Sequence, residues 1–140
     1  MRNLERRMSV RLNALHRCEQ IVVGGGTERW IARAIRQGRR FSLDGRSFMP
    51  GPIGECHRTV LRLLASGKIE RACYGFAFAG VHGDPQDLPS WYEHSWGLCD
   101  GKIIETTRPF ARYFGLALSP ADAADFDALL LQLGAKECRA

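Results

Sequence analysis

Apolar residues in the first part of this 140-residue chain recur at helical spacing. Over residues 3–20 they fall three or four positions apart, with arginines between them, and this spacing predicts an amphipathic helix. Its apolar members are Leu4, Met8, Leu12 and Leu15. The stretch IVVGGGT then breaks the pattern. Because no Gly-Lys-Ser/Thr follows it, we interpret it as a turn before a helix capped by Thr27 rather than as a phosphate-binding loop.

A second helix is predicted over ERWIARAIRQ, with a stop at Gly38. The side chains expected to be buried are Trp30, Ile31, Ala34 and Ile35. In the following RFSLDGRSFMPGPIG, Asp44-Gly45 lies between short alternating segments and predicts a small hairpin, whereas Pro50 and Pro52 prevent helix formation. We therefore expect residues 1–49 to form a basic helical extension of the same globule, and residues 50–140 to form the core.

The core is predicted to open with a helix from Cys56 to about Ser66, ended by Gly67. Val60, Leu63 and Leu64 share the side of Cys56. The next strand, RACYGFAFAG, divides its side chains by size. One face holds Tyr74, Phe76 and Phe78, and the other holds Cys73, Gly75, Ala77 and Ala79. We expect the face of small residues to let the Cys56 helix lie close to the strand.

The remaining pattern predicts a polar loop over VHGDPQDLPS, a hairpin over YEHSWGLCDGKIIETT, a strand over ARYFGLAL and a final helix. The final helix has Ser119 as its N-cap, Pro120 in its first turn and Asp122 near its positive end. Its expected buried stripe is Phe126, Leu129, Leu130 and Leu133, and Gly134 ends it. The order of elements is typical of an α+β fold.

The hairpin carries a histidine on one strand and a glutamate on the other. Asp100-Gly101 is a two-residue turn signal, and it pairs Cys99 with Lys102. Because opposed residues share a face, as do residues two apart on one strand, His94 and Glu105 become diagonal neighbours. Their Cβ atoms are expected to lie roughly 5.5–8 Å apart. A carboxylate and an imidazole at this separation can form a hydrogen bond, whereas a three-residue loop would place them on opposite faces.

A carboxylate on one imidazole nitrogen fixes the tautomer and leaves the other nitrogen available for proton transfer. Cys56 is the candidate nucleophile, since it begins a helix after a Gly- and Pro-rich approach, where the helix dipole favours a thiolate. The N–H groups of the same turn can hold an oxyanion. Cys56, His94 and Glu105 thus form a nucleophile, base and orienting group in that order along the chain.

Each residue also has a structural interpretation when it is taken alone. Cys56 can be a small core residue, His94 a half-buried histidine with satisfied hydrogen bonds, and Glu105 a surface strand residue. Trp96 and Tyr113 either line the pocket of the site or pack in the core. We interpret His57 as an exposed helix residue. A metal site would draw on Cys56, His57, His82, His94 and Cys99, whose spacing does not match a zinc site, so we expect no metal or cofactor.

The segment GECHRTVLRLLASGKIERACYGFAF…EHSWGLCDGKIIETT resembles the transglutaminase-like branch of the papain-like cysteine enzymes. Gly54-Glu55-Cys56 matches the Gly-x-Cys that opens a helix in that family, Gly75 its strand glycine, and His94-Ser95-Trp96 its His-x-Trp. Glu105-Thr106-Thr107 stands where the family has Asp-Pro-Thr. Glu therefore replaces Asp, which lengthens the reach to His94 by one methylene, and Thr106 replaces Pro.

The resemblance covers residues 50–118, and the order of its core also resembles small cell-wall peptidases of the NlpC/P60 type. It implies a papain-like core in which the Cys56 helix packs on a small antiparallel sheet, in a small bacterial or phage member of the superfamily. The implied activity is cysteine-dependent hydrolysis, deamidation or acyl transfer on an amide or ester bond, with a peptide, a protein or a small molecule as substrate. Gly54, Glu55, Trp96 and Tyr113 are expected to line the substrate pocket.

Charge and cysteine content add a second hypothesis. Residues 1–46 hold 11 arginines and 4 acidic residues, whereas the rest of the chain holds 9 basic and 11 acidic residues. The arginine-rich segment is either a solvated helical surface or a binding module for nucleic acid or an acidic protein partner. Five cysteines without a C-x-x-C pair favour a reduced, cytoplasmic protein without a disulfide framework, and no apolar run is long enough to cross a membrane.

Overall fold

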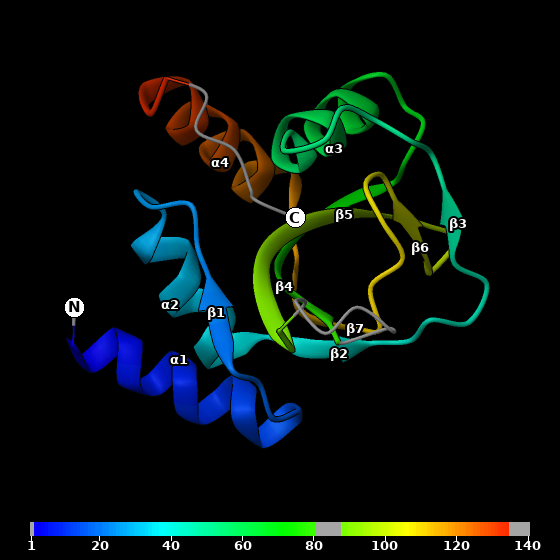
Figure 1. Cartoon of the computed structure of the whole chain (residues 1–140). Coiled ribbons are helices and arrows are strands. Elements are labelled where there is room, and N and C mark those ends of the chain that lie inside the picture. The colour runs from blue at the N-terminus through cyan, green and yellow to red at the C-terminus, as the bar shows by residue number, and fades with distance from the viewer. Residues whose placement is uncertain (1, 81–87, 135–140) are drawn as a thin grey trace.

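The computed structural model describes residues 2–80 and 88–134 of the chain. Within these ranges the fold is α+β, with four helices and one mixed sheet of seven strands (Figure 1). The elements in chain order are α1 (Arg2–Leu15), β1 (Gln20–Val22), α2 (Glu28–Gln37), β2 (Arg39–Phe41), β3 (Ser47–Phe48), α3 (Cys56–Ala65), β4 (Arg71–Ala79), β5 (Ser90–Cys99), β6 (Lys102–Glu105), β7 (Arg112–Ala117) and α4 (Pro120–Gln132). The predicted polar loop at residues 81–90 lies mostly outside the described residues.

The sheet has the strand order β2-β7-β4-β5-β6-β3, with β1 joined to β5 off this path. One edge of β5 is shared by two strands. β1 runs parallel to its first part, Ser90–Tyr92, and β6 runs antiparallel to its last part, Gly97–Cys99. Residues 93–96 of β5 pair with neither β1 nor β6. The stretch of β5 that carries His94 therefore lies where β1 and β6 diverge.

The two faces of the curved sheet support two separate cores. All four helices cover the outer face, where they pack on the large side chains of β4, among them Tyr74, Phe76 and Phe78 (Figure 1). The strands curl around a second core that contains no helix residue among those described. Its members are Phe41, Cys73, Ala77, Trp96, Leu98, Ile103, Phe110 and Tyr113. The predicted division of β4 into large and small faces is therefore confirmed.

The Cys56 helix lies on the opposite face of β4 from the one predicted. The ring of His57 on α3 lies 5.8 Å from the ring of Tyr74, and Val60 belongs to the outer core with Phe76. The small residues serve strand packing instead. A Cβ on Gly75 would lie 2.2 Å from the backbone oxygen of Phe114, so this glycine lets β7 approach β4.

The first 49 residues contribute more than helices. They supply β1, β2 and β3, each paired with a strand from the rest of the chain. The predicted hairpin at Asp44-Gly45 is wrong, because β2 pairs with β7 and β3 pairs with β6 instead of with each other. The turn itself is present, with Gly45 at φ 74°.

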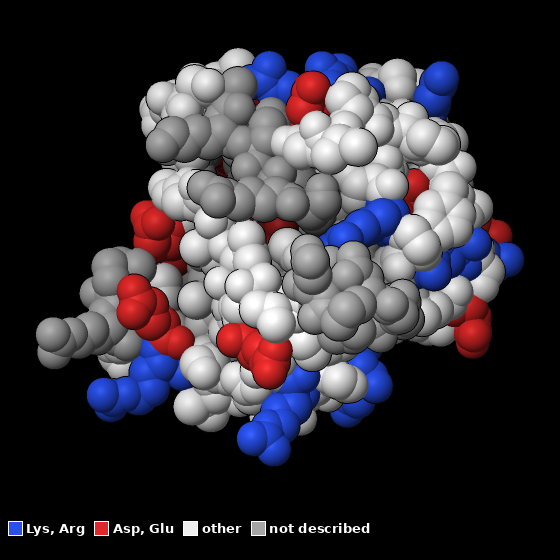
Figure 2. Space-filling view, in the orientation of Figure 1, with Lys and Arg blue, Asp and Glu red and all other residues white. Residues whose placement is uncertain are grey.

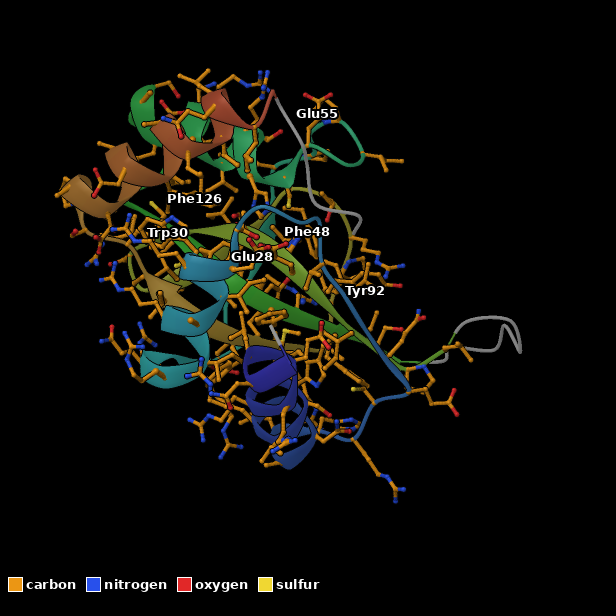
Figure 3. All side chains as sticks on the ribbon, turned by 90° about the vertical axis from the view of Figure 1, so that its left-hand side faces the viewer. Glu28, Trp30, Phe48, Glu55, Tyr92 and Phe126 are labelled. Carbon is orange, nitrogen blue, oxygen red and sulfur yellow. The ribbon has the colours of Figure 1, made fainter. Side chains whose placement is uncertain are left out.

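The three later helices follow the expected positions, whereas α1 ends at Leu15 instead of residue 20, and Gln20–Val22 forms β1 where a turn was predicted. In α2 the four predicted core residues are all buried, and Trp30 packs against Phe126 of α4 at 5.5 Å between ring centroids (Figure 3). Ser119 caps α4 by accepting a hydrogen bond from the N–H of Asp122. Thr27 precedes α2, but its hydroxyl donates to Glu93 instead of capping the helix. Among the described residues, no helix combines the length and the apolar character needed to span a bilayer.

Candidate active site

The turn between β5 and β6 sets the register on which the candidate site depends. Asp100 and Gly101 both have positive φ, 55° and 74°, as a two-residue type I′ turn requires. Cys99 pairs with Lys102, as predicted from the sequence. His94 and Glu105 therefore project from neighbouring strands onto the inner face of the sheet.

His94 and Glu105 form a buried hydrogen-bonded pair. The Nε2 atom of His94 lies 3.0 Å from Oε1 and 3.1 Å from Oε2 of Glu105, and both side chains are 0% exposed. An ionised carboxylate only accepts hydrogen bonds, so Nε2 carries the proton that is shared with it. In the neutral ring Nδ1 then holds a lone pair, and this buried atom has no hydrogen-bond partner among the described residues.

Glu105 is held in place by further donors. The Tyr113 hydroxyl donates to Oε1 at 2.6 Å, and Oε2 accepts from the backbone N–H groups of Thr106 and Thr107 at 2.9 and 2.8 Å. The Thr107 hydroxyl adds a contact of 3.0 Å. Burial raises the pKa of Glu105, but the bonds from His94, Tyr113 and Thr107 outweigh it and leave the pKa below its ordinary value. The carboxylate is therefore ionised at neutral pH.

Aromatic side chains enclose the His94 ring. Phe110 lies 4.5 Å from it between ring centroids, Trp96 stacks at 6.3 Å, and Tyr113 lies at 6.5 Å. Trp96 is 0% exposed, and its Nε1 has no hydrogen-bond partner among the described residues. Trp96 and Tyr113 therefore pack in the inner core beside the His94–Glu105 pair, and their role in lining a substrate pocket stays a prediction.

Cys56 begins α3, as predicted, and the loop before it is tied to the same part of the sheet. The N–H of Met49 donates to the carbonyl of Glu105, and the N–H of Gly51 donates to that of Thr106. Gly54 has φ 79°, a value that favours glycine, and turns the chain into the helix. Glu55 lies at the N-cap position and forms an exposed ion pair with Arg62 at 3.5 Å.

The Cys56 side chain is fully buried and disulfide-bonded, and its partner lies outside the described residues. The expectation that the cysteines are reduced is therefore wrong for Cys56, whereas Cys18, Cys73 and Cys99 are free thiols. The nearest described polar contact of Cys56 Sγ is Nδ1 of His57, at 3.8 Å. The hydrogen bonds among the described residues join His94 to Glu105 but do not join Cys56 to His94.

His57 is buried, so its interpretation as an exposed helix residue is wrong. It is 2% exposed, its Nδ1 lies 2.5 Å from the Ser95 hydroxyl, and its ring lies 5.3 Å from the ring of Phe126. Burial, with a smaller effect of His94, lowers its pKa to about 3, so the ring is neutral at physiological pH. Sequence reasoning also missed Ser95 and Arg46, which contact groups of the candidate site.

A metal centre gains no support from the part of the chain that the structure describes. No cluster of three or more His, Cys, Asp or Glu side chains is arranged there to hold an ion. His82, which the sequence-based metal hypothesis included, lies outside the described residues. A cavity of about 420 Å³ lies between α3 and α4, lined by Leu61, Leu118 and Ala123 among others, and neither His94 nor Glu105 borders it.

The arginines of the N-terminal segment are partly used in packing. The guanidinium group of Arg11 lies 5.0 Å from the ring centroid of Phe114, and that of Arg39 lies 3.9 Å from that of Phe41. Arg33 forms an ion pair with Asp122 at 2.7 Å. On the face seen in Figure 2, basic side chains alternate with acidic and uncharged ones. These contacts favour a structural role for several arginines, and the binding-module hypothesis stays a prediction.

Comparison with known proteins adds no relative: neither a family model, nor a curated protein, nor a solved structure matches the chain.

Proposed function

We propose that this chain is a cysteine-dependent acyl-transfer enzyme of the transglutaminase-like, papain-like type. Cys56 is its nucleophile, His94 its general base and acid, and Glu105 the group that orients His94. The observation that carries the proposal is the buried His94–Glu105 pair, in which Nε2 is bound at 3.0 Å and Nδ1 is left without a described partner. A buried polar atom without a partner is costly, and a catalytic role is one explanation of why a protein retains it.

The location of α3 supports Cys56 as the nucleophile. This helix packs on the outer face of β5, the strand whose inner face carries His94, and the loop before Cys56 donates hydrogen bonds to the backbone carbonyls of Glu105 and Thr106. The start of the helix favours a thiolate through its dipole, and the backbone N–H groups of a first helical turn are suited to an oxyanion. The proposal requires that the Sγ atom released by reduction comes within hydrogen-bond reach of His94 Nδ1.

The reaction begins once a thiol reductant has opened the Cys56 disulfide. The Sγ proton passes to His94 Nδ1, and the thiolate attacks the carbonyl carbon of an amide or ester. The bond to the amine or alcohol then breaks, the leaving group takes the proton from His94, and a thioester remains on Cys56. Water or an amine attacks the thioester, transfers a proton through His94 and restores the Cys56 thiol.

Alkylation kinetics test this assignment. The protein is reduced with dithiothreitol, treated with iodoacetamide at neutral pH, and the modified cysteines are mapped by mass spectrometry. We expect Cys56 to react faster than Cys99, and the His94→Ala substitution to slow Cys56 while leaving Cys99 unchanged. Near-ultraviolet circular dichroism establishes that the variant is folded. Equal rates for Cys56 in the folded variant and the wild-type protein would refute the proposal.

A further inference from the structure

The segment between β6 and β7, together with Tyr113 at the start of β7, supplies most of the groups that hold the His94–Glu105 pair. Thr107 donates its N–H and its hydroxyl to Glu105, the Phe110 ring lies 4.5 Å from the His94 ring, and Tyr113 donates its hydroxyl to Glu105. Residues 108–111 of this segment are outside any helix or strand. The position of the pair therefore depends on what fixes an irregular segment.

Arg46, in the loop between β2 and β3, contacts this segment. Its Nη1 atom donates to the carbonyl of Phe110 at 2.5 Å and lies 3.4 Å from the Tyr113 hydroxyl oxygen. Arg46 is half-buried although its neighbours from Ser42 to Gly45 are exposed. The turn at Gly45 brings the side chain back over the sheet, where the guanidinium lies 5.9 Å from the ring centroid of Tyr113.

The directions of these hydrogen bonds are fixed by the chemistry of the groups. A guanidinium only donates, and an ionised carboxylate only accepts. Arg46 therefore donates to the Tyr113 oxygen, and the Tyr113 proton points to Glu105, which accepts from His94 on the same oxygen. The order Arg46 to Tyr113 to Glu105 supports the His94 tautomer in which Nε2 carries the proton and Nδ1 is the base.

We propose that Arg46 is a positioning residue of the site, which holds Phe110 and Tyr113 against the His94–Glu105 pair without touching substrate. This inference rests on the proposed function for its effect on catalysis. Its effect on the His94–Glu105 hydrogen bond does not depend on that function, because the bond exists whether or not Cys56 is a nucleophile.

The first test observes the hydrogen bond itself. In ¹⁵N-labelled protein, the Nε2–H of His94 is expected to give a downfield proton signal that is protected from exchange with water. Arg46→Gln removes the donor fork and should speed this exchange about tenfold or broaden the signal beyond detection. The matched control is Arg108→Gln. It removes an arginine that also contacts Phe110, since Arg108 lies over the rings of Tyr92 and Phe110 at 4.9 and 5.1 Å. Equal exchange in both variants would overturn the inference.

The second test measures the rate of Cys56 alkylation against pH in the reduced protein. We expect Arg46→Gln to move the midpoint of the profile upward and to lower the rate at pH 7 by about threefold to tenfold. Arg46→Lys, which keeps the charge but loses the fork, should recover part of the loss. A role in folding alone would leave the midpoint unchanged and would contradict the inference.

The two tests separate the inference from the proposed function. If His94→Ala leaves the reactivity of Cys56 unchanged, the proposed function is contradicted. Altered exchange of the Nε2–H in Arg46→Gln would still support the positioning role in that case. Conversely, His94-dependent reactivity together with identical exchange and pH profiles in the Arg46 and Arg108 variants supports the function and overturns the role of Arg46.

Discussion

His94 and Glu105 lie 11 positions apart in the sequence, yet Nε2 of one is 3.0 Å from Oε1 of the other inside the sheet. The two-residue turn at Asp100-Gly101 lies between them and sets the register of β5 and β6, and the alternation of side chains along each strand places both on one face. Both side chains are completely buried. Loss of one partner of such a buried pair destabilises the folded protein, so the pair gives direct predictions for substitution.

Glu105→Gln should destabilise the protein by about 2–4 kcal/mol at pH 7. The carboxylate accepts from His94, Tyr113, Thr106 and Thr107, and an amide in its place presents two donors to groups that already donate. Urea unfolding followed by circular dichroism measures the change. Tyr113→Phe removes one donor and keeps the ring, so we expect a smaller loss, about 1 kcal/mol. A Glu105→Gln variant as stable as the wild type would contradict the buried, ionised state of Glu105.

The same carboxylate predicts a dependence of stability on acid. The pKa of Glu105 in the folded protein is lower than in the unfolded chain, so its contribution is fully present above the unfolded value, about 4.3. The contribution is lost as pH falls through the folded value. Glu105→Gln should therefore lose less stability than the wild type between pH 5 and pH 3, as measured by urea unfolding at each pH. Parallel curves for the two proteins would exclude this linkage.

His57 predicts a second acid effect, which begins at a higher pH than that of Glu105. Its pKa of about 3 lies below the ordinary value of 6.5, so the unfolded chain binds more protons between these values and stability falls as pH falls across them. The whole effect is on the order of 5 kcal/mol. His57→Phe keeps a ring against Tyr74 and Phe126, and it should remove this acid sensitivity. Since Phe leaves the Ser95 hydroxyl unpaired, the variant is combined with Ser95→Ala.

The comparison for His57 is the slope of stability against pH rather than stability at one pH. Between pH 6 and pH 4 we expect the wild-type free energy of unfolding to decline and that of the His57→Phe/Ser95→Ala variant to stay nearly level. A matched variant, His16→Phe, changes a histidine near the end of α1 that packs on Phe78 at 4.3 Å, outside the His57–Ser95 contact. It should keep the wild-type slope.

Local sequence signals predicted the parts of the site that depend on one turn or one helix. The positive φ values at Asp100 and Gly101 require the residue types found there, and this turn alone sets the register of His94 and Glu105. The start of α3 at Cys56 followed from the Pro- and Gly-rich approach and the apolar spacing behind it. In both cases the determining residues are close in the sequence.

Features that depend on distant pairing were missed. The segments on either side of Asp44-Gly45 look like a hairpin, but Phe41 pairs with Tyr113 and Phe48 pairs with Glu105. No local pattern indicates this choice, nor the return of Arg46 to Phe110. The burial of His57 did have a signal, since it lies three residues before the buried Val60 on the same side of α3. Burial was not predicted because the side chain is polar, and burying a histidine without a partner such as Ser95 is unfavourable.

Cysteine reactivity should separate the thiols by environment. Without reductant, we expect Cys56 to resist iodoacetamide because it is disulfide-bonded. Burial raises the pKa of Cys73 to about 12, so this thiol should stay unmodified in the folded protein at any pH near neutrality. Cys99 is half-buried on the hairpin and should react slowly. Mass spectrometry of peptides prepared without reductant identifies the partner of Cys56, and its recovery as a free thiol would contradict the disulfide.

Gly75 provides a test of how closely the strands under the site approach each other. A Cβ at this position would lie 2.2 Å from the Phe114 oxygen and 2.5 Å from the Gly115 Cα, and both are backbone atoms that cannot move without disturbing the pairing of β4 with β7. We expect Gly75→Ala to destabilise the protein by about 3 kcal/mol or more, measured by urea unfolding at pH 7. Because β7 carries Tyr113, the variant should also weaken the protection of the His94 Nε2–H.

The matched control for Gly75→Ala is Gly80→Ala, just after the end of the same strand. Among the described residues, a Cβ there would meet the ring of Phe78 alone, at 3.4 Å, so we expect a change within about 0.5 kcal/mol. The contrast between the two alanines isolates the contact between β4 and β7 from the general effect of replacing a glycine. If the two variants unfold at the same urea concentration, Gly75 does not hold the strands together, and the small-residue face of β4 has another explanation.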